Sequence, residues 1–327
     1  MHGSARTSRT VAAKRLLGAS GLAGSLLLAT ACSSGPGFHA GPSTDALGPL
    51  PSPSSTALPY GEALDDAVTP VGAALALLNK ATNLKDLGTA LDNAQQAAST
   101  ASRDLQDSTA PADASDQNHK LWAALNVLST DLGTVQTDIT TDKACATSSA
   151  LAEAGQLQSL KDVAGALQTL SAAGYASNYT APTLPAPQQR ALGNGTWVRQ
   201  GGTSGTGVLK VDNSNGDGDA VVTLSKSGQS AYSLYVVKGQ STTVNGIEDG
   251  TYDVYTTSGL DWDANAKMFT ENCDFQKFDS PVPYTTDYHG DGSYTYYEET
   301  ITLHAKAGTD PGDTASSKVP PDQYPTP

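Results

Sequence analysis

Residues 84–107 read LKDLGTALDNAQQAASTASRDLQD, and their apolar residues recur in alternating steps of three and four. The recurring residues are Leu84, Leu87, Leu91, Ala94, Ala98, Ala101 and Leu105. This spacing places a single apolar stripe along one face of an α-helix, which is typical of a helix that packs against other helices. The stretch therefore predicts an amphipathic core helix.

Three further stripes with this spacing surround the first one. They are Leu64, Val68, Val71, Leu75 and Leu78; Leu121, Leu125, Leu128, Leu132, Val135 and Ile139; and Leu157, Leu160, Ala164, Leu167 and Leu170. The breaks at 81–83, 108–111 and 140–142 are short, so residues 60–175 are predicted to form an antiparallel four-helix bundle. The alternative is a helix that binds lipid or a partner, but these faces have few Lys, Arg or Trp residues at their margins.

The pattern changes to short alternating strands between residues 193 and 307, with Gly, Asn and Asp between them. The clearest candidate strands are 208–211, 220–224, 233–237, 242–244, 251–255 and 294–304. Strands at this spacing with turn residues between them predict a β-sandwich. In the last strand, Tyr297, Ile301 and Leu303 share one face, opposite the face of Tyr296, Glu298, Thr300, Thr302 and His304. The fold class expected for the whole chain is α+β with two domains.

The run from Val244 to Val254, VNGIEDGTYDV, resembles an edge of transthyretin-like and carboxypeptidase-regulatory-like bacterial sandwich modules. The resemblance covers residues 206–306 and includes a G-x-D-W-D stretch, 259–263. It implies that glycine permits the tight turn and that Tyr252 packs into the core. Its implication is limited to architecture, because the same fold hosts many functions.

The N-terminus has the three parts of a bacterial secretion signal that ends at Cys32. Basic residues come first (Arg6, Arg9, Lys14 and Arg15), an uncharged stretch 16–31 follows, and small residues precede Cys32. The segment resembles a lipobox, which implies that residues 1–31 are removed and that Cys32 is lipidated. Diacyl modification anchors a protein stably to a membrane. The alternative is an ordinary secretory signal that leaves an incidental thiol.

Three segments are too rich in Pro, Ser and Gly, or too poor in large apolar residues, to predict a packed core. Residues 32–59 are expected to be a disordered tether between the lipid and the folded body. Residues 176–192 are expected to be a Pro-rich hinge between the domains, and residues 308–327 a disordered tail.

Acidic residues outnumber basic ones by 33 to 19, and loss of the basic leader makes the chain more acidic still. This excess argues against nucleic acid and against electrostatic docking on anionic lipid, which both require Lys and Arg clusters. The partners we expect are therefore the membrane, through the lipid anchor, and an unidentified protein or cell-wall component.

Cys145 and Cys273 are the cysteines that remain beside the lipidated one. A pair of cysteines outside the cytoplasm favours a disulfide, which here would staple the two domains together. The alternative is two free, buried thiols, because spatial proximity cannot be read from the sequence.

Acidic and aromatic residues gather in a region that we expect to be a loop. The carboxylates are Asp261, Asp263, Glu271, Asp274 and Asp279, and the aromatic residues beside them are Trp262, Phe269, Phe275 and Phe278. The carboxylates are a candidate calcium site, and Trp262, Phe269 and Phe275 a candidate platform for a carbohydrate. The favoured interpretation is that the rings seal the end of the sandwich and the acids face solvent.

Two other acidic turns have spacings that suggest calcium. Residues 287–298 follow the EF-hand spacing, but His289 is a poor ligand for calcium and the flanks read as strands, so a hairpin is favoured. In the turn 213–219, Leu224 stands where the bidentate glutamate is needed, so a plain turn is expected.

No nucleophile elbow, metalloprotease helix or phosphate-binding glycine loop is found in the sequence. The prediction is a non-enzymatic, lipid-anchored binding or structural protein outside the cytoplasm, without a resident cofactor. The alternatives are a calcium-dependent adhesion module and a cell-wall carbohydrate hydrolase, whose paired carboxylates need not be close in sequence.

Overall fold

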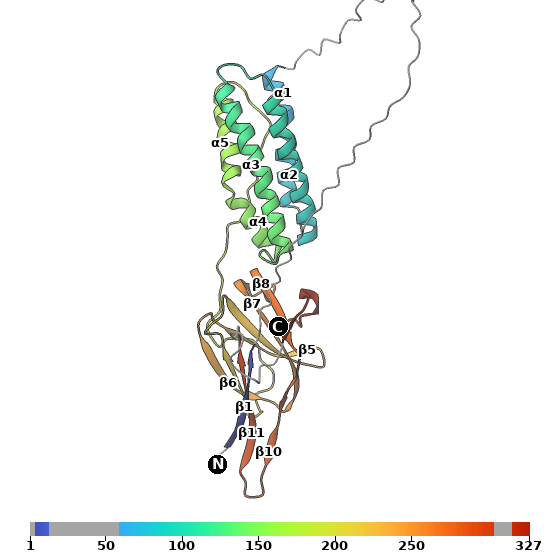
Figure 1. The fold of residues 1–327 in the computed structure, drawn as a ribbon, viewed down its shortest axis with the longest axis vertical. Coiled ribbons are helices and arrows are strands. Elements are labelled where there is room, and N and C mark those ends of the chain that lie inside the picture. The colour runs from blue at the N-terminus through green and yellow to red at the C-terminus, as the bar shows by residue number, and fades with distance from the viewer. Residues whose placement is uncertain (1–3, 13–58, 304–315) are drawn as a thin grey trace, which may run out of the picture. The chain divides into compact units, whose positions relative to one another are not determined.

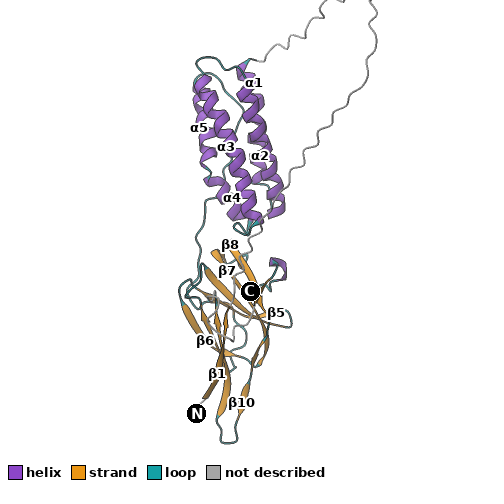
Figure 2. Cartoon of the chain, viewed as in Figure 1, coloured by secondary structure: helices purple, strands orange, loops and turns teal. Residues whose placement is uncertain are grey.

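The structure is a computed structural model that describes residues 4–12, 59–303 and 316–327. The predicted lipidation site Cys32 and the predicted tether lie outside these ranges. The chain folds as α+β: helices come first and strands follow, apart from one N-terminal strand (Figure 2). Of the helices in the described ranges, none combines the length and the apolar character that a membrane span needs.

Five helices follow one another along the first half of the chain and share one apolar core. They are α1 (Tyr60–Leu78), α2 (Leu84–Asp107), α3 (Ser115–Thr140), α4 (Thr147–Gln156) and α5 (Gln158–Ala172). Helix α1 packs on α2, α2 on α3, and α3 on α5, as Figure 1 shows. The predicted breaks are confirmed, and the apolar stripe of α2 is buried from Leu87 to Leu105.

The fourth predicted helix is in fact two helices. The backbone leaves the helical conformation at Leu157, with φ −55° and ψ 123°, which ends α4 and begins α5. The buried residues of α5 are Ser159, Val163, Ala166, Leu167 and Leu170, so the stripe is offset from the predicted one and Ala164 is half-buried. Helix α4 was not expected, because its buried residues are mostly alanines, which give little hydrophobic contrast.

Residues 176–192 contain no helix or strand, but the first part of this segment is bound to α1. The side-chain amide of Asn178 donates to the Asp65 carboxylate at 2.8 Å. The Asn79 amide of α1 donates to the Thr183 carbonyl at 3.0 Å. The hydrogen bonds at Asn178 and Thr183 hold the first part of this segment against α1. The prediction of a hinge is therefore wrong for that part.

The strands form two sheets, one of five strands and one of seven. The five-stranded sheet has the order β1-β11-β3-β6, with β10 also paired to β11, and the seven-stranded sheet has the order β12-β8-β7-β4-β5-β2, with β9 paired to β7. The strands of the first sheet are β1 (Ser4–Ala12), β3 (Gly207–Asp212), β6 (Ser241–Ile247), β10 (Thr286–Tyr288) and β11 (Tyr294–Thr302). Those of the second are β2 (Trp197–Arg199), β4 (Asp219–Lys226), β5 (Gln229–Val236), β7 (Gly250–Asp263), β8 (Met268–Phe278), β9 (Val282–Tyr284) and β12 (Ser316–Lys318).

A second apolar core contains residues from both sheets. Leu209, Val211 and Ile301 come from the five-stranded sheet, and Val222, Leu234 and Val254 are among those from the seven-stranded sheet. Tyr297 and Leu303 also pack into it, so the buried face of the last strand is the one that carries Tyr297, Ile301 and Leu303. Hydrophobic burial therefore joins the two sheets.

The segment that resembles transthyretin-like modules forms β6, a short turn and β7. Because β6 pairs with β3 and β7 pairs with β4, this turn carries the chain from one sheet to the other. Gly250 has φ 158° and Gly246 has φ 94°, which side-chain-bearing residues rarely adopt. Tyr252 is 2% exposed in the shared core. Both implications for this segment are confirmed.

The end of the chain is folded onto the sheet, contrary to the prediction of a disordered tail over residues 308–327. Strand β12 pairs with β8, and the ring of Tyr324 packs edge-on against Phe275 with centroids 5.4 Å apart. The Tyr324 and Thr223 hydroxyls are 3.0 Å apart and share a hydrogen bond. These contacts join segments far apart in sequence, so no local pattern predicted them. Residues 308–315 lie outside the described ranges.

Candidate functional site

The connection between α3 and α4 is bound to β8 like a short extra strand. Ala144 and Glu271 form an antiparallel bridge. Backbone hydrogen bonds run from Cys145 N to the Thr270 oxygen at 2.8 Å and from Asn272 N to the Lys143 oxygen at 2.9 Å. These two backbone hydrogen bonds pair the loop in register with β8.

A disulfide reinforces the same place. Cys145 of the α3–α4 connection is bonded to Cys273 of β8, and their Cα atoms are 6.3 Å apart. The hydroxyl of Ser149, in the first turn of α4, donates to the Thr270 carbonyl at 2.6 Å. The predicted disulfide is present, and it joins the helical part to the sheet as expected.

Arg190 holds the neighbouring strand β7. Its guanidinium donates to both oxygens of Asp261, at 2.9 and 2.6 Å, and to Asp263 at 2.8 Å. Its backbone carbonyl accepts from Trp262 N at 2.8 Å. The side chain of Asp261 is 5% exposed, and its hydrogen bonds from Arg190 and Thr270 lower its pKa to about 2. The chain entering the sheet region is thus fixed to β7 by a charged clamp.

The predicted loop of acidic residues is in fact the hairpin of β7 and β8, and its carboxylates are engaged separately. Asp261 and Asp263 bind Arg190, Asp274 accepts from Gln276, and Asp279 accepts from Ser317. Within residues 4–12, 59–303 and 316–327, no group of three or more His, Cys, Asp or Glu side chains is placed to share a metal ion. The structure does not bring the five predicted calcium ligands together.

The predicted aromatic platform is a buried cluster, so this part of the prediction is wrong. Trp262, Phe269 and Phe275 are 2%, 0% and 5% exposed. The Trp262 ring packs edge-on against Phe269 and Tyr235, with centroids 5.0 and 5.8 Å apart. The rings cover the outer face of the seven-stranded sheet and do not seal the end of the sandwich as the favoured interpretation expected, and none of them is available to a ligand.

A polar cleft of about 420 Å³ lies where α3, α4 and β8 meet. It contains the carboxylates of Asp138, Glu153 and Glu271, together with Lys143, which pairs with Asp138 at 2.9 Å. Burial raises the pKa of Glu153 to about 7, a hydrogen bond with Asp138 and the charges of Asp138 and Glu271 act in the same direction, and Lys143 opposes them. Burial and the charge of Asp261 also raise the pKa of Glu271.

Clustered carboxylates with a raised pKa are what the hydrolase alternative requires. The residues that line this cleft include no aromatic side chain to hold a sugar ring. Its walls are the same loop and strand that the bridge and the disulfide tie together. The cleft therefore fits a structural junction better than a substrate site.

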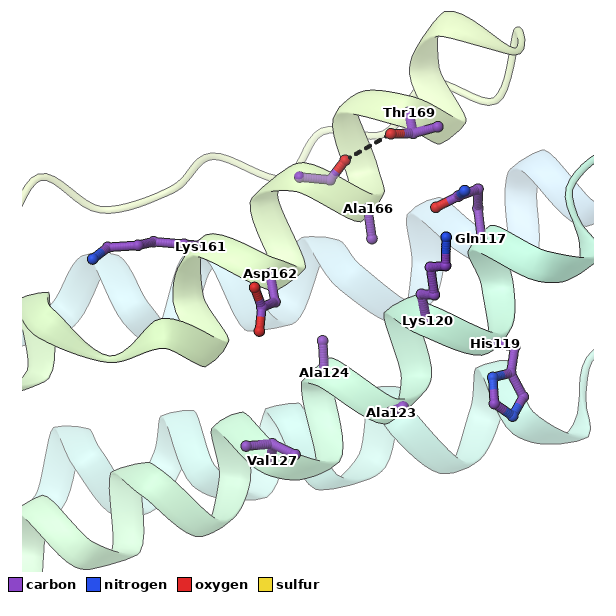
Figure 3. Close-up of a pocket in the computed structure, with 11 residues that line it drawn as sticks. Gln117, His119, Lys120, Ala123, Ala124, Val127, Lys161, Asp162, Ala166 and Thr169 are labelled. Carbon is purple, nitrogen blue, oxygen red and sulfur yellow. Dashed lines mark hydrogen bonds between the residues drawn. The ribbon is translucent and has the colours of Figure 1, made fainter.

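A larger groove of about 640 Å³ lies between α3 and α5 (Figure 3). Small residues, Ala123, Ala124 and Ala166, form its middle, and Lys120 and Lys161 stand at its sides. The polar side chains along it are flexible and half-buried or exposed, so no fixed group orients a ligand there.

The two calcium-like turns are turns, as expected. Strands β10 and β11 form a hairpin in which Tyr288 is paired with Tyr294. Glu298, which would complete an EF-hand loop, instead pairs with Lys210 of β3. In the turn after β3, Asn213 is fully buried and donates to the Gly218 and Val236 carbonyls at 3.0 and 3.2 Å.

One partly exposed feature was not predicted, a row of tyrosines on the β10–β11 hairpin. The ring centroids of Tyr288 and Tyr294 are 6.0 Å apart, and those of Tyr294 and Tyr296 are 6.2 Å apart. The signal that would have revealed it is the alternation Tyr294-Thr-Tyr296 beside Tyr288, across a Gly-rich turn of a hairpin.

Comparisons of the chain with models of protein families, with curated proteins and with solved structures found no match. The resemblance of residues 244–254 to transthyretin-like modules therefore stays a prediction that rests on those residues. Two features of the described residues carry chemistry that bears on function, the disulfide-bonded junction between the α3–α4 connection and β8, and the tyrosine row of the β10–β11 hairpin.

Proposed function

We propose that this chain is a lipid-anchored binding or structural protein at the outer face of the cytoplasmic membrane, without catalytic activity. Its folded body would be an antiparallel helical bundle followed by a β-sandwich. The observation that carries the proposal is the Cys145–Cys273 disulfide. Disulfides persist in oxidising compartments and are rare in reducing ones, so this bond supports the destination that the leader and Cys32 predict.

The junction also supports a role as a rigid body. The helical part is tied to β8 by a disulfide and backbone hydrogen bonds, and the following chain is tied to β7 by Arg190. Covalent and charged ties at two adjacent strands restrict bending between the two parts. Such a body suits a protein that presents a surface of fixed shape at the end of its predicted tether.

The charge of the chain limits the partners. An acidic body is repelled by anionic lipid headgroups and by nucleic acid. In this proposal the lipid on Cys32 makes the membrane contact, and the folded body is free to bind a protein or a cell-wall component. The tight turn at Gly250 and the buried Tyr252 support a transthyretin-like module in the sheet region of this chain.

The test is to express the full chain in a bacterium that processes lipoproteins and to label the cells with an alkyne analogue of palmitate. The wild-type protein should carry the label, sediment with membranes and migrate on non-reducing gels as a disulfide-bonded monomer. Cys32→Ala should lose the label, whereas Cys145→Ser should keep it and lose only the disulfide. Unlabelled wild-type protein in the cytoplasm, with both thiols open to alkylation, would refute the proposal.

A further inference from the structure

Three tyrosine rings form a row on one face of the β10–β11 hairpin. Tyr288 and Tyr294 are paired directly across the two strands, and Tyr296 follows two residues along β11. Side chains two residues apart in a strand lie on the same face, so all three share one face. Tyr297, between Tyr296 and Glu298, turns the other way and packs against the shared core. The row is therefore on the outer face of the five-stranded sheet.

Tyr288 is the exposed ring of the row, and Tyr294 and Tyr296 are half-buried. Tyr288 is 77% exposed, the largest exposure among the large hydrophobic residues in the described part of the chain. The Thr286 hydroxyl donates to Asp249 at 2.8 Å, and Ser293 N donates to Asp291 at 2.9 Å. These bonds fix both ends of the hairpin, so the rings stand on a preformed surface. Preformed surfaces lose less conformational entropy on binding.

The charge around the row selects against anions. Between residues 279 and 303 there are five carboxylates and no Lys or Arg, and one of the five, Glu299, is buried on the core-facing side of β11. Of the nearby carboxylates, Glu298 is paired with Lys210 at the edge of this face. The surface thus combines aromatic rings with a negative potential, which repels anionic lipids, nucleic acids and acidic polymers.

We propose that this tyrosine face binds a polysaccharide that has no acidic groups. A pyranose ring presents a face of C–H groups, which carry a small positive charge and stack on the negative face of an aromatic ring. A row of rings about 6 Å apart repeats this contact along a polymer. Neighbouring carboxylates accept hydrogen bonds from sugar hydroxyls and attract free amino groups. The inference gives the proposed binding function its ligand class and rests on it for access to a cell-wall glycan.

The experiment measures retention of the purified, detergent-solubilised full chain on chitin, a neutral polymer, and on chitosan, its amino-bearing form. The variants are Tyr288→Ala/Tyr294→Ala, which removes the rings, and Tyr288→Phe/Tyr294→Phe, which keeps them. Leu260→Ala is the matched control, since Leu260 is an exposed apolar residue, 43% exposed, on another strand. Thermal melting of each variant shows that it is folded.

We expect retention of the wild type on chitin, chitosan or both, and an apparent affinity at least about tenfold lower for the alanine variant, a loss of 1.4 kcal/mol. The phenylalanine and Leu260 variants should bind like the wild type. Absence of binding to both polymers, or equal binding by the alanine variant, overturns the inference. So does stronger retention on heparin, and so does retention on polylysine alone, which would indicate a basic protein partner.

This assay is separate from the test of membrane anchoring. If the labelled protein is membrane-bound but no polymer is retained, the ligand class is wrong and the proposed anchoring stands. If the polymers bind but Cys32 carries no lipid, the tyrosine face is a glycan site and the proposed location is wrong.

Discussion

Cys145 and Cys273 are bonded across a sequence separation of 128 residues, and their bond joins the α3–α4 connection to β8. The bond stands within a group of backbone hydrogen bonds that includes Cys273 N to the Asp142 oxygen at 2.8 Å. The α3–α4 connection is therefore held on β8 by backbone hydrogen bonds as well as by the disulfide. The two effects can be separated experimentally.

Reduction should lower the stability of the protein without separating the two parts. Closing a loop of this length stabilises a fold by about 5 kcal/mol in the chain-entropy model, which is an upper value for native bonds. We expect the urea midpoint to fall on addition of dithiothreitol, and Cys145→Ser/Cys273→Ser to match the reduced wild type. Equal midpoints for the oxidised and reduced proteins would show that the bond contributes nothing.

Arg190→Ala should destabilise the protein in a pH-dependent way. The pKa of Asp261 is lowered to about 2, so its interactions stabilise the fold above about pH 4 and are lost as the pH falls towards 2. We expect a loss of about 2 kcal/mol at pH 7, since one pKa unit corresponds to about 1.4 kcal/mol, and a shrinking difference from wild type below pH 4. Urea denaturation across this range measures it.

Lys277→Ala is the control for that series, because Lys277 forms a more exposed pair with Asp253 at 3.3 Å. Exposed pairs contribute little, so its effect should stay below about 1 kcal/mol. A loss for Arg190→Ala that is the same at pH 2.5 and pH 7 would contradict the role assigned to Asp261.

The helices were predictable because the contrast between their apolar and polar residues is strong and lies within each helical segment. Leucine stripes such as that of α3 from Leu121 to Leu132 are buried as the spacing predicted. Helix α4 was missed because its buried face includes Ala150 and Ala154, and alanine differs little from serine in hydrophobicity. The disulfide was predictable because few cysteines could pair.

The second half of the chain shows what local patterns miss. The sequence predicts a loop for the acidic and aromatic region from Asp261 to Asp279, and Glu271, Asn272 and Asp274 within residues 268–278 are of types that disfavour strands. Residues 268–278 form β8, with Asn272 in a left-handed conformation, φ 51°, next to the bridge between Glu271 and Ala144 of the α3–α4 connection. This pairing partner lies more than a hundred residues earlier in the chain. Arg190 and Tyr324 likewise gain their roles only from distant contacts.

Trp262→Ala should be strongly destabilising, in contrast to Tyr288→Ala. Trp262 is 2% exposed and packs on Phe269 and Tyr235. Its removal leaves a cavity and should lower the free energy of unfolding by about 3–5 kcal/mol. Tyr288 is exposed, and its removal should change the unfolding free energy by no more than about 0.5 kcal/mol. Chemical denaturation of both variants measures the difference. An unchanged midpoint for Trp262→Ala would contradict its place in the core.

Processing before Cys32 should open one edge of the first sheet. Strand β1 lies within the predicted leader and pairs in parallel with residues 295–302 of β11. When the leader is removed, that edge of β11 loses its partner, so its amides should exchange with deuterium faster. The comparison is between the mature protein and Cys32→Ala, in which the leader is expected to remain. Strand β4, between β5 and β7, is the internal control, and equal protection of 295–302 in both proteins would refute the expectation.

Glu153→Gln should stabilise the junction at alkaline pH. Burial, the hydrogen bond with Asp138 and nearby negative charges raise the pKa of Glu153 to about 7, so the folded state holds this proton more tightly than the unfolded state. As the pH rises from about 4.5 to 7, ionisation of Glu153 therefore costs stability, and the cost stays constant above pH 7. Glutamine keeps a donor for Asp138 but cannot ionise. We expect the variant to exceed the wild type by about 1–3 kcal/mol at pH 8 and to match it near pH 4. Glu62→Gln, which removes an exposed carboxylate of α1, should show no such dependence, and a Glu153→Gln variant less stable than wild type at pH 8 would refute the assignment.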